Sequence, residues 1–149
     1  MRNIFLLFIS NMVLISILHG QGVMPNDKQK KDIYSLIDKY SQAREKRDTV
    51  LLKSILTTDI DQLVSTGEWR NGMEASLTGM MKSSANSPGT RTLSIEKIRL
   101  FNSNSSIVDC KYEIQNTDGT SRKMWSTFIV VSDKGIWKIS AIRNMLPTE

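Results

Sequence analysis

Few side chains in this chain could carry acid–base chemistry. The single histidine, His19, falls inside an apolar N-terminal run, so nearly every histidine-dependent nucleophile, general base or zinc site is excluded from the mature protein. Asp109 stands in an alternating apolar segment. If its side chain is buried, its carboxyl pKa rises and it becomes a candidate general base; if it faces solvent, it only keeps the sheet soluble. Arg143 could pair with Asp109 or bind an anionic ligand group.

Other reactive groups are equally sparse. Cys110 is the only cysteine, so an internal disulfide is excluded, and its apolar surroundings predict a buried thiol. Asp59 and Asp61 flank Ile60 where a helical pattern gives way to a strand pattern, which predicts capping and turn formation. No third ligand follows them at a spacing suited to a metal ion. The sequence therefore predicts no metal and no cofactor.

The N-terminus has the order of a secretory signal peptide. Arg2 supplies the positive charge, residues 4–18 are almost wholly apolar, and Gly20, Gln21 and Gly22 follow. A retained membrane anchor is the alternative, but 15 residues reach only about 22 Å against a hydrocarbon core of about 30 Å. We therefore expect a signal peptide over residues 1–22, cleaved after Gly20 or Gly22. The mature protein would be secreted or periplasmic and would not bind a membrane.

The charge distribution argues against a nucleic-acid partner. The formal net charge of +5 falls to +4 when Arg2 is removed with the leader. Lysines and arginines are scattered, and no basic stripe alternates with aromatic residues as nucleic-acid binding requires.

Helical spacing dominates the first half of the mature chain. After a linker over residues 23–29, one domain spans 30–146. Asp27 is the expected N-cap of a first helix that runs to about residue 47, with charged residues, arginines included, opposite its apolar stripe. Asp48 would cap a second helix over 49–56. Residues 62–66 are predicted as a strand, a capping box from Asn71 to Glu74 as the start of a third helix, and 83–89 as a loop.

The second half reads as long antiparallel strands. The apolar alternation slips by one between residues 93 and 100, which predicts a β-bulge. Asp118-Gly119 and residues 132–135 mark two hairpin turns. The expected fold class is α+β, with three N-terminal helices packed on a curved, mainly antiparallel sheet.

Aligning these hairpins divides the strand residues between two faces. One face would carry Asp109 with Ser126 or Phe128, together with Trp137, Ile139 and Arg143. The other would carry Cys110, Tyr112, Trp125 and Ile142. Periodicity leaves open which face the helices cover.

Several segments together resemble the SnoaL-like domains of the nuclear-transport-factor-2-like (NTF2-like) superfamily. They are residues 43–48 with Leu51 and Leu52, 58–61, 67–72 and 135–139, in an order that spans about residues 30 to 145. The resemblance implies a cone-shaped α+β barrel whose apolar cavity takes small hydrophobic molecules. Limonene epoxide hydrolases of this superfamily use a carboxylate–arginine–carboxylate set, which Asp109 and Arg143 could imitate in part.

Three functions follow as hypotheses. The favoured one is an exported domain that binds a small apolar molecule without turnover. Its ligand-binding residues would be Trp69 at the cavity lip and, around it, Tyr112, Ser126, Phe128, Trp137, Ile139 and Arg143. The alternative is an isomerase, cyclase or hydrolase with Asp109 as its base, assisted by Arg143 or Tyr112. A third is an interaction module that forms a homodimer through its exposed sheet face.

Overall fold

The computed structural model describes residues 24–147, and the predicted signal peptide lies outside this range. The elements in chain order are α1 (Asp27–Lys46), α2 (Thr49–Ile55), β1 (Leu56–Leu63), β2 (Trp69–Asn71), α3 (Gly72–Asn86), β3 (Gly89–Asn102), β4 (Ser105–Asn116), β5 (Ser121–Asp133) and β6 (Ile136–Met145). Among the helices of this described part, none has the length and apolar character needed to span a bilayer.

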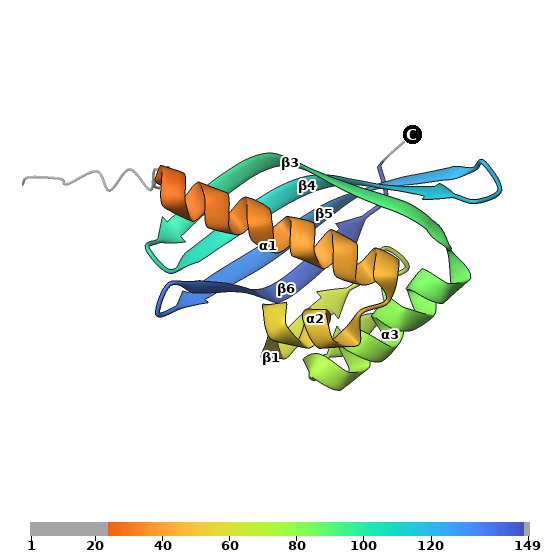
Figure 1. Cartoon of the computed structure of the whole chain (residues 1–149), viewed down its shortest axis with the longest axis horizontal. Helices are drawn as coiled ribbons and strands as arrows, with labels where there is room; N and C mark the ends of the chain where they lie inside the picture. Colours follow the sequence, from red (N-terminus) through yellow and green to blue (C-terminus); the bar gives the residue numbers. More distant parts are fainter. Residues whose placement is uncertain (1–23, 148–149) are drawn as a thin grey trace, which may run out of the picture.

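One six-stranded sheet carries the fold, in the order β2-β1-β6-β5-β4-β3. All neighbours are antiparallel except β1 and β6, which run parallel. The three helices lie on one face of this curved sheet, with α1 crossing its long strands and α3 beside β1 (Figure 1). The predicted α+β class is therefore confirmed. We call the helix-covered side the inner face and the opposite side the outer face.

The helix starts follow local capping chemistry. Asn26, not Asp27, caps α1: Asn26 Oδ1 accepts from the Gln29 amide at 2.8 Å, and Gln29 Oε1 accepts from the Asn26 amide at 3.1 Å. This reciprocal pair needs a glutamate or glutamine three residues after the cap, a place that Gln29 fills for Asn26 and that Lys30 would occupy for Asp27. Asp48 caps α2 as predicted, through a 2.9 Å bond from the Leu51 amide to its Oδ1.

Two segments between the helices differ from expectation. The strand predicted at 62–66 begins at Leu56 and ends at Leu63, so Asp59 and Asp61 lie within β1. Its polar residues are extended because β1 pairs with both β2 and β6, a tertiary effect that local composition does not report. Asn71 makes no side-chain capping bond, and α3 continues to Asn86 through the serines that predicted a loop.

The β4–β5 hairpin has a one-residue register difference from the predicted alignment. Asn116 and Thr120 close it, which leaves a three-residue loop with Gly119 at φ +86° rather than a two-residue turn. Asp109 is therefore opposite Thr127, not Ser126 or Phe128. Because strand side chains alternate, this shift places Asp109 on the outer face and Ser126 and Phe128 on the inner face.

A second irregularity changes β6. The pairing of β5 with β6 shifts between Ile129 and Val130, whose partners are Ala141 and Ile139. Trp137 and Ile139 consequently face the helices, whereas Arg143 points to the outer face. The predicted grouping of all three residues was wrong because this bulge left no break in the sequence pattern. The bulge predicted in 93–100 is confirmed between Ile95 and Lys97.

Candidate functional site

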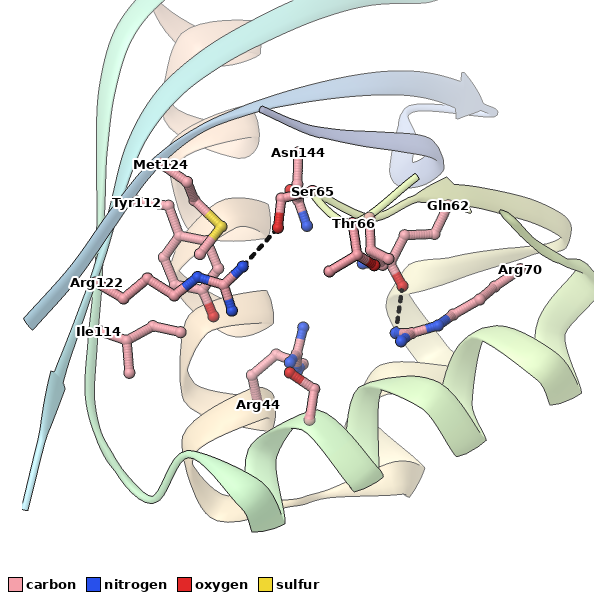
Figure 2. A pocket seen from close by; sticks show the side chains of 12 residues that line it. Arg44, Gln62, Ser65, Thr66, Arg70, Tyr112, Ile114, Arg122, Met124 and Asn144 are labelled. Atoms are coloured by element: carbon pink, nitrogen blue, oxygen red, sulfur yellow. Dashed lines mark hydrogen bonds between the residues drawn. The ribbon is translucent and has the colours of Figure 1, made fainter. Parts of the chain in front are cut away.

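A cavity of about 110 Å³ opens at one end of the inner face. It is enclosed by the C-terminal parts of α1 and α3, the loop after β1, and the adjoining ends of β4, β5 and β6. Side chains reach into it from all of these elements (Figure 2). Its lining consists of Arg44, Gln62, Val64, Ser65, Thr66, Arg70, Ser83, Tyr112, Ile114, Arg122, Met124 and Asn144.

Arg44 is the most deeply buried charge in this lining. It extends from the apolar stripe of α1 and is 3% exposed. Its Nη1 donates to Tyr40 Oη at 2.9 Å and its Nε to Ser84 Oγ at 3.2 Å. No carboxylate of the described chain forms an ion pair with it. A buried charge without a counter-charge is costly, so this arrangement calls for a compensating group.

The surroundings of Arg44 keep the Tyr40 phenol neutral and the guanidinium charged. Burial raises the pKa of Tyr40, an effect that Arg44 only partly opposes. Burial by itself would lower the pKa of Arg44, but the phenolic oxygens of Tyr40 and Tyr112 outweigh it and leave that pKa raised. At neutral pH the closed end of the cavity therefore holds the positive charge of Arg44 beside the neutral hydroxyl of Tyr40.

Tyr112 presents an unsatisfied polar atom to the same space. The residue is 4% exposed and lines the cavity, yet its Oη has no hydrogen-bond partner among residues 24–147. Such buried hydroxyls are rare in folded proteins because each forfeits its bonds to water. The orphaned hydroxyl and the unpaired guanidinium belong to one cavity.

Two further arginines lie nearer the opening. Arg70 Nε pairs with Glu68 Oε1 at 2.9 Å, and Arg70 Nη1 donates to Gln62 Oε1 at 3.3 Å. Arg122 is exposed, and its Nη2 donates to Ser65 Oγ at 2.6 Å. Figure 2 shows Arg44, Arg70 and Arg122 approaching the cavity from three sides. Arg70 is already neutralised by Glu68, whereas Arg122 has only a hydroxyl partner.

The residues predicted to bind a ligand are divided by the structure. Tyr112 lines the cavity. Ser126 does not, but its Oγ donates a 2.7 Å hydrogen bond to Oδ1 of Asn144, which does. Phe128 and Ile139 are fully buried in the main hydrophobic cluster. Phe128 meets the ring of Tyr40 edge-on, with the centroids 5.2 Å apart. Trp137 borders a separate groove beside α1 and α2.

The three remaining predicted residues lie on the outer face. Asp109 accepts a 2.7 Å bond from Thr127 Oγ1. Arg143 pairs with Asp61 rather than Asp109, and its guanidinium stacks 4.7 Å from the ring centroid of Trp69. Asp109 thus lies outside the cavity, and the general-base hypothesis loses the buried position on which it depended.

The thiol offers no nucleophile either. Cys110 is fully buried on the inner face, and burial raises its pKa to about 12, with a smaller contribution from Asp109. A thiol with so high a pKa is protonated and unreactive at neutral pH. Across residues 24–147, no three acidic, histidine or cysteine side chains are grouped closely enough to hold a metal ion.

Sequence reasoning missed the arginines of the cavity. Arg44 follows Ile33, Ile37 and Tyr40 at helical spacing, so it lies on the buried stripe of α1 and not on the polar face as predicted. That periodicity was a usable signal. The roles of Arg70, Arg122 and Asn144 had no such signal, because each depends on how distant strands and loops meet.

Neither a family model nor a curated protein matches this chain. Several solved structures, however, superpose on it. A protein of unknown function from Shewanella oneidensis, described as NTF-2 like, superposes with a TM-score of 0.67 at 18% identity, over 78% of this chain and 98% of its own. A cystatin-like domain of unknown function from Nostoc punctiforme reaches 0.74 at 11% identity, over 84% and 81%. The fold is NTF2-like.

A third similarity agrees with this assignment. An NTF2-like protein of unknown function from Pseudomonas putida superposes with a TM-score of 0.67 at 14% identity, over 80% of this chain and 87% of its own. At such low identities the likeness establishes the fold alone, and a shared fold does not determine function. Function must therefore be argued from the cavity.

Proposed function

We propose that this NTF2-like domain is an exported binding protein that holds a small molecule in the cavity beside Arg44 and Tyr112. The orphaned Tyr112 hydroxyl carries the proposal, since a buried polar atom without a protein partner is expected where a ligand supplies one. Within the superfamily, the segments quoted from the sequence favour the SnoaL-like group.

Binding without turnover fits the chemistry of the lining. The cavity is bordered by arginine, amide, hydroxyl and apolar side chains, and by no aspartate, glutamate or cysteine of the described chain. General acid–base catalysis needs a group that titrates near the working pH. The described residues of the lining include no carboxylate or thiol that could serve as a general base, so the ligand is bound and released unchanged.

The ligand is expected to be amphipathic rather than wholly apolar. Arg44, Tyr112 and Asn144 offer polar contacts, whereas Val64, Ile114 and Met124 offer apolar ones. A molecule with one polar end and a short apolar body matches this division.

Ligand-observed NMR of the mature protein with a mixed fragment library tests the binding function. We expect fragments to bind, and Thr66→Trp to abolish their binding, because Thr66 is an exposed residue at the cavity rim and the indole would fill the opening. Thr120→Trp, in the β4–β5 turn, is the matched control that should leave binding intact. If no fragment binds, or if Thr66→Trp leaves all binding unchanged, the proposal fails.

Export is tested separately by the intact mass of the protein recovered from the producing cells. Cleavage after Gly20 or Gly22 gives a chain that begins at Gln21 or Val23. A membrane-bound form that retains Met1 would contradict export with cleavage.

A homodimer through the outer face is a second candidate, which the exposure of two tryptophans supports. Trp69 and Trp125 are 53% and 38% exposed, although tryptophan is normally well buried. Light scattering across a dilution series is the test. A dimer weakened by Trp125→Glu supports this role, and a monomer at all concentrations excludes it.

A further inference from the structure

We infer that the ligand of this cavity is a small carboxylate whose two oxygens are bound by Arg44 and Tyr112. The inference rests on the proposed binding function and adds the ligand's chemical class. It comes from three observations: the charge of the interior, the donors left unused, and the size of the space.

The interior of the domain carries positive charge only. The buried charged residues of the described chain are Arg44 and Arg91, and no aspartate or glutamate is among them. The two Nη atoms of Arg91 donate to the carbonyl oxygens of Gly89 at 3.1 Å and Ser87 at 2.7 Å, beside the end of α3, where the helix dipole is negative. Arg44 has only the neutral hydroxyls of Tyr40 and Ser84. A ligand anion would therefore compensate Arg44.

The unused donors match a carboxylate. Nη1 and Nε of Arg44 donate to protein hydroxyls, whereas its Nη2 makes no hydrogen bond within residues 24–147. The hydroxyl of Tyr112 is a second donor without an acceptor. Both groups border the same cavity, so one can serve each oxygen of a planar carboxylate. Bonds from a guanidinium to a carboxylate are short and about twice as strong as neutral ones.

Charge and volume favour a monoanion over a phosphate. Arg44 is the single uncompensated charge at the closed end, because Arg70 is paired with Glu68 and Arg122 is exposed near the opening. A dianion would leave a buried negative charge in excess. The volume of about 110 Å³ is smaller than the cavity of about 150 Å³ that holds benzene in an engineered protein, so a benzene-sized body would extend from this space into its opening. The apolar body would contact Ile114 and Met124.

Benzoate and benzamide form the matched probe pair, because they share shape and differ in charge. We expect isothermal titration of the mature protein to show benzoate binding at least about tenfold more tightly than benzamide, as one charge-assisted hydrogen bond implies. Tyr112→Phe should weaken benzoate binding about tenfold and benzamide binding by less, because a hydrogen bond to a neutral amide is weaker than one to a carboxylate. Arg44→Met should abolish the preference for benzoate.

Arg143→Gln is the control for charge, since it removes a guanidinium on the outer face and should leave benzoate affinity unchanged. If Arg44→Met does not fold, Tyr112→Phe decides by itself. Any of three results would overturn the inference. They are equal affinity for the two probes, tighter binding of inorganic phosphate than of benzoate, and a benzoate affinity that Tyr112→Phe does not change. In those cases fragment binding blocked by Thr66→Trp still supports the binding function, so the two failures are distinguishable.

Discussion

The ion-paired charges of the outer face differ from the buried Arg44 of the inner face in how they are compensated. On the outer face three ion pairs join charged strand residues: Arg143 with Asp61, Lys111 with Glu96 at 3.2 Å, and Lys123 with Glu113 at 3.9 Å. On the inner face Arg44 meets hydroxyl groups alone. Adjacent residues of β4, Lys111 and Tyr112, therefore belong to different electrostatic environments although one bond separates them.

The exposed ion pairs keep the outer face soluble, whereas the charge of Arg44 would be compensated by a bound ligand. Exposed pairs contribute at most about 1 kcal/mol each, because water already solvates both partners. The buried Arg44 guanidinium lacks that solvation, and its hydrogen bonds to the Tyr40 and Ser84 hydroxyls replace it only in part. The burial of Arg44 therefore lowers the stability of the ligand-free domain at the cavity that we propose as the binding site.

The largest effect is expected from packing on neighbouring residues of β5. Phe128→Ala removes a fully buried ring that packs against Tyr40 and should lower the free energy of unfolding by about 3–5 kcal/mol. Thr127→Ala, on the outer face, should cost less than about 1 kcal/mol, the net value of its hydrogen bond to Asp109. Urea unfolding followed by tryptophan fluorescence measures both. Comparable losses would show that the faces are not distinct.

Replacing Arg44 or Arg143 by methionine tests directly whether the buried and the paired arginine contribute differently to stability. Arg44→Met should leave the ligand-free protein as stable as before or up to about 2 kcal/mol more stable, because an uncompensated buried charge gives way to an apolar side chain of similar volume. Arg143→Met should lower stability by up to about 1 kcal/mol, since it breaks the pair with Asp61. A loss above about 2 kcal/mol for Arg44→Met would mean that its bonds to Tyr40 and Ser84 outweigh its burial.

Cys110 adds a pH dependence that belongs to the inner face. Its folded pKa of about 12 exceeds the ordinary value of 9.0, so the folded state holds the thiol proton more tightly than the unfolded state. The contribution of this thiol to the free energy of unfolding is fully present below pH 9 and is lost as the pH rises toward 12.

Unfolding at pH 8 and pH 10 should therefore show a loss that Cys110→Ala lacks, about 1 kcal/mol of difference between the two proteins. A thiol reagent should label the native protein only at the rate of unfolding. Rapid labelling at pH 8 would show that Cys110 is accessible and contradict its burial.

The smallest effect distinguishes two buried tyrosines. Tyr112→Phe removes an orphaned hydroxyl and should stabilise the ligand-free protein by up to about 1 kcal/mol. Tyr40→Phe removes the acceptor of the 2.9 Å bond from Arg44 and should destabilise it by a similar amount. Thermal unfolding of the two variants measures the sign. Destabilisation by Tyr112→Phe would imply a partner for its hydroxyl.

The sequence determined the elements wherever the cause was local. The stripe of Ile33, Leu36, Ile37 and Tyr40 specified α1, Asp48 specified the start of α2, and the slip near Ile95 specified a bulge. The α+β class followed from these patterns, because hydrophobic period and capping depend on residues a few positions apart. The resemblance to the NTF2-like superfamily was sufficient to anticipate the fold that the solved structures confirm.

Only the tertiary structure decided which side chains meet. A three-residue loop at Gly119 and a bulge in β6 set the phase of two strands, and each single-residue shift exchanges the faces of every residue beyond it. That exchange moved Asp109 and Arg143 out of the cavity and brought Tyr112 beside Arg44, which lies 68 positions earlier in the chain. The sequence encodes this pairing through turn geometry and packing across the sheet, which no local pattern displays.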